Sequence, residues 1–299
     1  MIKNTLKLIP LLLALLILAP SLALAHQPRI TESRLTQVPN PEISKIYYGK
    51  LTGEPDVYVI NASEAFDLYV NVLVPDIAGQ KKDVSAVVLK DLPAGEAGEK
   101  EIALLDSKNF KWKKFYEPFG ADTYWRGPQF KARAEAGTYE IRVWSSSNDN
   151  KYSLSIGEIE AFDGKEALGA LTIIPELKKD FFDKSPIGFI ASPFGWGLIV
   201  IMYVLAFIVG FLYRTILKKF AKNSPLPAGA LAKEGRGAKN IGKPDRLLRA
   251  AIGVALLLWA ITTSWSPILI FFSGFCVFEA IFSWCGFYAA LGKKTCPME

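Results

Sequence analysis

The most reactive side chains of this sequence lie near its C-terminus. The chain has three cysteines, Cys276, Cys285 and Cys296, all within the last 24 residues. On one continuous helix Cys285 and Cys296 would lie about 16 Å apart, too far for a disulfide. A helix that ends at Gly292 would let the tail fold back and bring the two thiols together. Such a pair could support redox, persulfide or soft-metal chemistry, although two cysteines without histidine make a poor closed metal site.

A carboxylate lies in the same apolar stretch. Cys276, Glu279 and Ser283 follow i, i+3, i+7 spacing, which places them on one face of a helix. A charged carboxylate is costly at that depth in a membrane. We therefore expect Glu279 to be protonated, hydrogen-bonded or facing a partner helix. A hydrogen bond between helices is the simpler interpretation, and a role in carrying an ion or solute is the alternative.

The densest aromatic stretch runs from Phe115 to Phe130 and includes polar residues that suit a binding surface. Its candidate binding residues are Trp112, Asp122, Tyr124, Trp125 and Arg126. Aromatic faces edged by polar groups suit a carbohydrate or a protein partner. The alternative is that these rings pack a domain core, with Gly127-Pro128 forming a turn.

No constellation of residues typical of catalysis stands out. His26 is the only histidine, so the sequence offers no Ser-His-Asp set in its interior, and it has no HExxH, phosphate-binding glycine loop or CxxC. A histidine at a processed amino terminus can chelate copper, but such sites need further ligands. We predict no enzyme activity, no cofactor and no metal site.

Alternating apolar and polar residues indicate the elements that would position these side chains. Strict alternation predicts strands at 66–74, 139–144 and 152–156, and weaker patterns predict strands at 56–60, 85–90 and 101–105. Turn-forming clusters separate them. This part of the chain lacks cysteine and must be stable through its own core. We predict an all-β, jelly-roll-like sandwich over residues 26–160, with a core that includes Leu68, Val70, Val72 and Tyr139.

The end of this region is similar to a known domain. Gly137-Thr138-Tyr139 opens one strand and Tyr152-Ser153-Leu154 lies in the next. This pattern resembles the closing hairpin of the bacterial pre-peptidase C-terminal-type β-sandwich. The resemblance implies an accessory domain without chemistry of its own, in which Gly137, Tyr139 and Tyr152 serve the fold.

The first 25 residues have the features of a signal peptide. Lys3 and Lys7 precede an apolar segment at 8–18, and Ala23-Leu24-Ala25 forms a small-x-small cleavage site. We expect residues 1–25 to direct the sandwich across the cytoplasmic membrane, whether or not they are cleaved.

The remaining chain predicts a membrane anchor. We expect a helical stalk at 161–184, with Pro175 opening its second helix, and a transmembrane helix at 185–213. Next we expect a basic cytoplasmic linker at 214–243 and then a two-helix membrane hairpin at 244–299. The hairpin would contain spans at 250–266 and 268–291, so that three transmembrane helices are expected in all. Residues 214–249 contain 10 Lys and Arg against two acidic residues. Such a loop suits anionic lipid better than nucleic acid.

The hairpin is similar to a membrane family. The matching residues include Asn240-Ile241-Gly242, Arg249, Gly253, Cys285-Gly286 and Thr295-Cys296. They resemble the YgaP-type two-helix inner-membrane domain of unknown function. Arg246 and Arg249 share one helix face at headgroup depth and can pair with lipid phosphate or with Asp245.

These features favour a non-catalytic protein of the inner membrane with its large domain exported. The sandwich would bind a protein partner, a glycan or a larger membrane complex, and the helices would contact lipid or a second copy. One alternative is a thiol redox or sulfur-handling protein that uses Cys285 and Cys296. The other is an ion or solute carrier centred on Glu279.

Overall fold

The structure is a computed structural model that describes residues 26–92, 98–161, 163–223, 239–291 and 293–295. The expected signal peptide, Gly292 and Cys296 lie outside this range. The described chain forms two compact units, a sandwich unit that ends at Ser192 and a helical unit that begins at Pro193.

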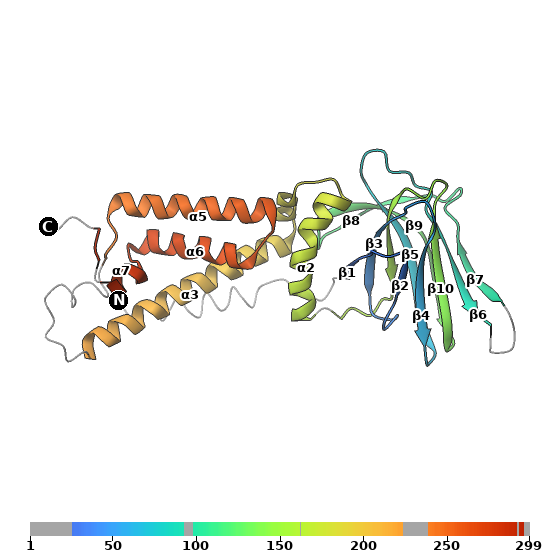
Figure 1. The fold of residues 1–299 in the computed structure, drawn as a ribbon, viewed down its shortest axis with the longest axis horizontal. Coiled ribbons are helices and arrows are strands. Elements are labelled where there is room, and N and C mark those ends of the chain that lie inside the picture. The colour runs from blue at the N-terminus through green and yellow to red at the C-terminus, as the bar shows by residue number, and fades with distance from the viewer. Residues whose placement is uncertain (1–25, 93–97, 162, 224–238, 292, 296–299) are drawn as a thin grey trace. The chain divides into compact units, whose positions relative to one another are not determined.

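The sandwich unit contains two mixed β-sheets (Figure 1). The six-stranded sheet has the order β1 (Gln27–Ile30), β3 (Lys45–Lys50), β11 (Lys151–Ile156), β5 (Phe66–Pro75), β9 (Asp122–Ala134) and β8 (Lys113–Glu117). The five-stranded sheet has the order β2 (Leu35–Gln37), β4 (Asp56–Ala62), β10 (Gly137–Trp144), β6 (Ser85–Asp91) and β7 (Glu99–Leu105). All six predicted strands are present, and the predicted β-sandwich is confirmed.

The core lies between the two sheets. Leu68, Val70 and Val72 of β5 are fully buried, and Tyr139 of β10 is 2% exposed, as their alternation predicts. Three polar side chains in the core are linked by hydrogen bonds. The Tyr152 hydroxyl donates to the Asp56 carboxylate at 2.7 Å and lies 2.8 Å from the Tyr58 hydroxyl. These buried hydroxyl groups therefore keep their hydrogen bonds.

The expected closing hairpin is wrong. β10 pairs with β4 and β6, whereas β11 pairs with β3 and β5, so the two strands belong to different sheets. The connection between them crosses the sandwich. Asn150 supports this crossing from within, because its amide donates to Asp83 at 2.7 Å and to the carbonyl of Lys81 at 3.1 Å.

The expected turn at Gly127-Pro128 is also wrong. Both residues lie inside β9, where the register with β5 shifts between Asn71 and Leu73. The shift is a β-bulge, which accommodates proline because a bulge leaves a backbone position unpaired. The Asn71 side chain supports it by donating to the carbonyls of Gly127 at 3.3 Å and Pro128 at 3.1 Å.

The segment after the sandwich packs on the outer face of the six-stranded sheet. Helix α2 (Gly164–Glu176) continues through Pro175 into the π-helical turn η1 (Leu177–Phe181), so Pro175 does not open a second helix. Leu177, Phe181 and Phe182 are buried against outward-facing side chains of β3, β5 and β9. A second short helix, η2 (Pro186–Ala191), ends this unit.

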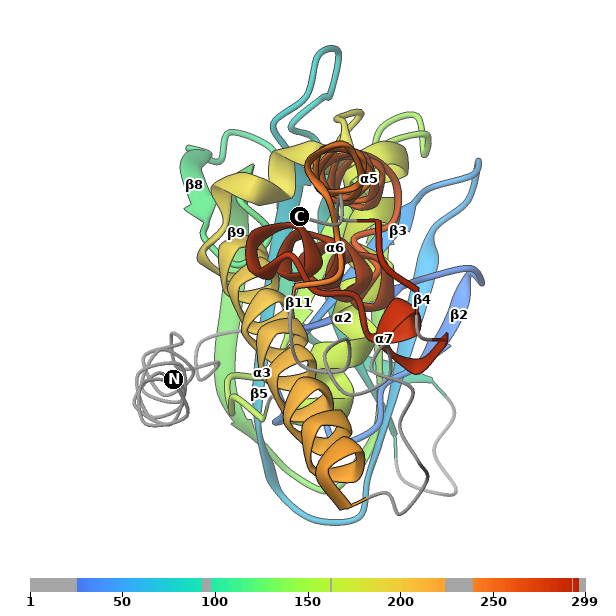
Figure 2. The same ribbon diagram turned by 90° about the vertical axis from the view of Figure 1, so that its left-hand side faces the viewer.

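The helical unit contains α3 (Pro193–Asn223), α5 (Lys243–Thr263), α6 (Pro267–Phe282) and α7 (Gly286–Leu291). α6 packs against both α3 and α5, and α3 is inclined to the other two helices (Figure 2). Gly274 of α6 permits this contact, since a β-carbon there would lie 3.1 Å from the Tyr203 ring of α3.

Two of the described helices, Pro193–Lys219 and Lys243–Thr263, are long and apolar enough to cross a membrane. The predicted third span at 268–291 is not continuous. α6 ends at Phe282, and Ser283 adopts a left-handed conformation with φ of 52°. Its 16 residues extend about 24 Å, less than the roughly 30 Å of a bilayer core. The structure thus has two helices of spanning length and a third, shorter apolar helix.

Candidate functional site

A cleft of about 260 Å³ opens on the outer face of the six-stranded sheet, beside the region that η1 covers. We call it the polar cleft. Side chains from β5, β8, β9 and β11 and from both ends of the sandwich sequence line it, among them His26, Tyr69, Glu117, Arg126, Ser155 and Glu160. These residues lie far apart in the chain, and the sheet order brings them together.

Arg126 provides the main positive charge of the polar cleft. It is exposed, and its guanidinium lies over the Phe115 ring at 4.0 Å from the ring centroid. Within the described residues, no carboxylate lies within ion-pairing distance of it. Stacking on an aromatic ring holds the guanidinium flat and leaves its N–H edge available. Arg126 is therefore positioned to bind an oxyanion.

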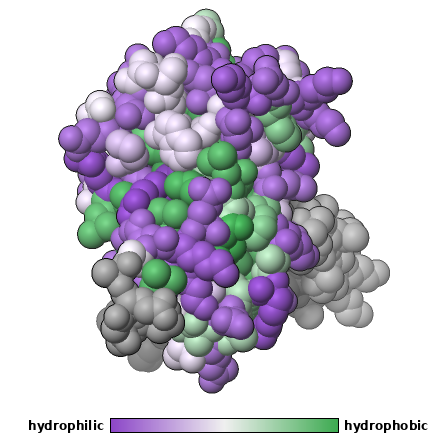
Figure 3. Space-filling view, turned by 90° about the vertical axis from the view of Figure 1, so that its right-hand side faces the viewer, coloured by the Kyte–Doolittle hydropathy of each residue, from purple (hydrophilic) through white to green (hydrophobic). Residues whose placement is uncertain are grey.

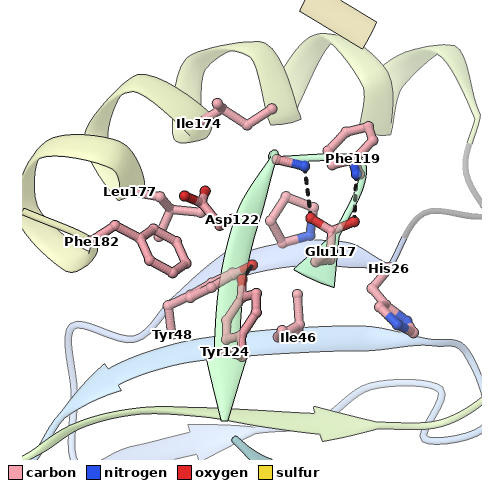
Figure 4. A pocket seen from close by; sticks show the side chains of 12 residues that line it. His26, Ile46, Tyr48, Glu117, Phe119, Asp122, Tyr124, Ile174, Leu177 and Phe182 are labelled. Carbon is pink, nitrogen blue, oxygen red and sulfur yellow. Dashed lines mark hydrogen bonds between the residues drawn. The ribbon is translucent and has the colours of Figure 1, made fainter. Parts of the chain in front are cut away.

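Glu117 of β8 provides a carboxylate in the lining of the cleft. Its two carboxylate oxygens accept hydrogen bonds of 2.7 Å from the backbone N–H groups of Phe119 and Gly120 (Figure 4). Burial raises the pKa of this carboxyl above its usual range. Glu117 also borders a chamber of about 30 Å³ beneath η1, large enough for one water molecule.

His26 lies at the junction of the cleft and this chamber and lines both. Its ring nitrogen Nδ1 contacts the Ser44 hydroxyl. Burial and the nearby Arg126 charge lower the pKa of His26, so the ring is neutral near pH 7. Within the described ranges, no three His, Cys, Asp or Glu side chains gather closely enough to hold a metal ion.

The predicted aromatic binding residues occupy several environments. Tyr124 is buried, with its hydroxyl 2.9 Å from that of Tyr48. Trp112 and Trp125 pack against the sandwich core, and the Trp125 indole donates to Asp76 at 2.8 Å. Only Arg126 of this set is exposed. The Tyr124 ring packs in the cluster under η1, and the Lys82 ammonium lies 3.8 Å from the Trp125 ring centroid, so the rings are engaged by contacts within the sandwich unit.

Asp122, the remaining member of the predicted set, is also buried. It forms an ion pair of 2.7 Å with Lys178 of η1, and both side chains are almost inaccessible to solvent. Lys184 reaches its second oxygen at 3.2 Å. Asp122 therefore connects the helical segment 164–192 to the sheet and is not available to an external partner.

A second exposed feature lies on the outer face of the five-stranded sheet. Leu35, Val57, Val87 and Leu104 form an apolar stripe on neighbouring strands, interrupted by Arg142 of β10. Leu35 is 58% and Leu104 is 53% exposed. Figure 3 shows a sandwich surface that is mostly hydrophilic, with apolar side chains gathered between the polar ones.

The helical unit contains its own buried charge network. Glu279 of α6 pairs with Arg249 of α5 at 2.5 Å, and Arg249 also pairs with Asp245 at 3.0 Å. The Thr295 hydroxyl donates to Asp245 at 3.0 Å. Arg246 donates to the carbonyl of Ala280 at 2.8 Å. Both arginines therefore connect α5 to α6, in addition to any contact with lipid headgroups.

The break between α6 and α7 is held by Asn240. This buried amide donates to the Cys285 carbonyl at 2.9 Å and accepts from the Cys285 N–H at 2.8 Å. The Asn240 N–H also donates to the carbonyl of Ser283 at 2.9 Å. Ser283 thus leaves the helix face that it was expected to share with Cys276 and Glu279, because its backbone ends α6.

The two described cysteines are free thiols. Cys285 is 2% exposed, and Cys276 is half-buried within α6. The other cysteine of the suggested thiol pair, Cys296, lies outside the described residues. Cys285 is therefore enclosed by the helical unit, next to the Asn240 hydrogen bonds.

Sequence reasoning missed Glu117, His26 and Asn240 as organising residues. The partners of Glu117 are local, and a Glu followed by Pro-Phe-Gly signals a turn with free N–H groups. Asn240 contacts residues more than 40 positions away, and nothing in its immediate sequence indicates this.

Comparison with protein families finds a match at the C-terminal end of the chain. Residues 238–299 match the family model described as "Inner membrane protein YgaP-like, transmembrane domain", which confirms the predicted resemblance of the hairpin. The match and the apolar helices support a protein of the inner membrane. A search of curated proteins finds no significant match.

Part of this chain is similar to several solved structures over almost their whole length. The pre-peptidase C-terminal domain of a Bacillus anthracis collagenase has 13% identity and a TM-score of 0.25, covering 41% of this chain and 92% of that one. The Yersinia pseudotuberculosis-derived mitogen has 17% identity and a TM-score of 0.27, covering 43% and 94%. A surface-associated copper-binding protein of Methylomicrobium album BG8 has 8% identity and a TM-score of 0.23, covering 44% and 98%. Similarity at this level indicates neither a ligand nor an activity.

Proposed function

We propose that this chain is a non-catalytic, membrane-anchored binding protein whose sandwich takes up its ligand or partner in the polar cleft. The large domain faces the extracytoplasmic side, and the helical unit anchors it in the inner membrane. The partner is a protein segment, a glycan or a component of a membrane complex.

One observation carries the proposal. The polar cleft contains an arginine that is stacked on a ring and has no carboxylate partner among the described residues. A surface arginine of this kind contributes little to the stability of the fold. Its position therefore favours a role in binding. Concave sites with a few fixed polar groups are typical of ligand binding.

The thiol alternative has less support. Cys285 is enclosed, and reactive cysteines are characteristically accessible. The carrier alternative also loses its main premise, because Glu279 is paired with Arg249 and is therefore not an isolated charge.

Native mass spectrometry of the chain, released from its own membranes in mild detergent, tests the proposal. Wild-type protein should carry a bound species that Arg126→Gln loses. Arg133→Gln is the matched control, since Arg133 lies on the same strand but pairs with Asp67 at 3.2 Å. Identical bound species in wild type and Arg126→Gln would show that the cleft is not the binding site.

A further inference from the structure

Two charges of opposite sign line the polar cleft on the neighbouring strands β8 and β9. Arg126 supplies the positive charge, and Glu117, which lines both the cleft and the small chamber, supplies the negative charge. Within the described residues, neither side chain has an ion-pair partner of its own. We infer that the cleft binds a small dipolar ligand, with its carboxylate on Arg126 and its ammonium group on Glu117. This inference rests on the proposed function of the cleft and specifies its ligand class.

The strand register sets the spacing between the two charges. In the β8–β9 ladder Glu117 pairs with Asp122, and Phe115 pairs with Tyr124. The Arg126 guanidinium lies over the Phe115 ring, two residues along β8 from Glu117. Two strand residues span about 7 Å. A matching ligand therefore carries its ammonium and carboxylate groups at about this separation.

Other charged groups lie around the cleft, and Asp122 and Lys178, which pair with each other, act on Glu117 with opposite signs. Glu158 is already paired with Lys131 at 2.6 Å, and Glu160 lies exposed at the rim. His26 is neutral near pH 7 because burial lowers its pKa. The Tyr69 side chain of β5 and the Ser155 side chain of β11 add hydroxyl groups to the cleft lining, on the side of β9 away from β8.

Glu117 suits an ammonium group for two reasons. Its oxygens are fixed by two backbone hydrogen bonds, so the carboxylate is already oriented. It also lies beside Tyr124 and Phe119 around the chamber (Figure 4), and aromatic rings stabilise a neighbouring cation. A cation bound there would offset the cost of keeping this buried carboxylate ionised.

The test compares three probes with the same carbon chain on the purified full-length protein. 6-Aminohexanoate carries both charges about 7.5 Å apart when extended, whereas hexanoate and hexylamine carry one each. Isothermal titration calorimetry should give 6-aminohexanoate an affinity at least about tenfold above either of the others, since each charged hydrogen-bonded contact is worth that much or more. Arg126→Gln and Glu117→Gln should each remove this advantage, and Arg133→Gln should keep it.

Two results would overturn the inference. Equal affinity for hexanoate and 6-aminohexanoate would mean that Glu117 takes no part, and binding of none of the probes would mean that the cleft is not selective for dipolar ligands. If the bound species of the native protein still depends on Arg126 in either case, the proposed function stands and only the ligand class is wrong. Circular dichroism of Glu117→Gln checks that the variant is folded, and the comparison of probes on wild-type protein does not depend on any variant.

Discussion

The buried ion pair between Asp122 and Lys178 should be the main polar contact that fixes the helical segment 164–192 to the sandwich. Lys178 is 1% exposed, and its ammonium lies 2.7 Å from the Asp122 carboxylate. Breaking a buried pair by removing one partner costs about 3–5 kcal/mol. We expect Lys178→Met to lower the free energy of unfolding by about 3 kcal/mol, at the low end of that range, because Lys184 still compensates Asp122.

Removing the acid should cost more than removing the base. Asp122→Ala leaves the Lys178 ammonium buried with the Ala121 carbonyl at 3.2 Å, so we expect a loss of about 5 kcal/mol. The double variant Lys178→Met/Asp122→Leu replaces the pair with apolar side chains, and it should be more stable than Asp122→Ala alone.

Urea denaturation of a fragment comprising residues 26–192, followed by circular dichroism, measures these differences. Lys184→Met is the control, since its side chain is 41% exposed and should contribute less than about 1 kcal/mol. A loss below about 1 kcal/mol for Lys178→Met would refute the reasoning, because it would place the pair in the range of surface salt bridges.

Three further predictions concern other parts of the chain. A fragment ending at residue 160 should unfold at lower urea concentration than the fragment 26–192, because it exposes the apolar sheet face that η1 covers; equal midpoints would show that this packing contributes little. The folded-state pKa of Lys45 is lowered to about 8 by burial, so the unfolded chain binds more protons above that pH. Stability should therefore rise between about pH 8 and pH 10.4, and Lys45→Met should lose this rise, as urea midpoints at several pH values will show. Asn240→Ala should speed maleimide labelling of Cys285 at least about tenfold by releasing the break between α6 and α7, and an unchanged rate would show that other contacts hold it.

Alternation along the sequence was sufficient to predict the core strands. β10 alternates buried and partly buried side chains, and β5 does so over its first half, because one face lies on the core and the other is freer there. β3 was not predicted, because it lacks an alternating pattern. The core covers one of its faces and η1 covers the other, so five of its six residues are buried. β9 escaped because the bulge at Gly127-Pro128 breaks its alternation.

The candidate site could be predicted only in part. Arg126 stood out by its aromatic neighbours, but the role of Glu117 depends on the register of β8 against β9. The third span could not be predicted correctly, because Asn240 lies more than 40 residues from the helix break that it holds. For the helix break, the missing information is a contact between distant parts of the chain, which local patterns do not contain.

Photo-crosslinking in cells tests the central claim most directly, namely that the polar cleft is the binding site of this membrane protein. Benzoylphenylalanine in place of Tyr69 puts the photoreactive group in the cleft, at a position that an aromatic ring already occupies. The same substitution at Leu104, on the apolar stripe, serves as the comparison. We predict one reproducible adduct at position 69, which Arg126→Gln abolishes and Arg133→Gln leaves intact. An adduct at position 104 with none at position 69 would contradict the account and would place the binding surface on the opposite sheet.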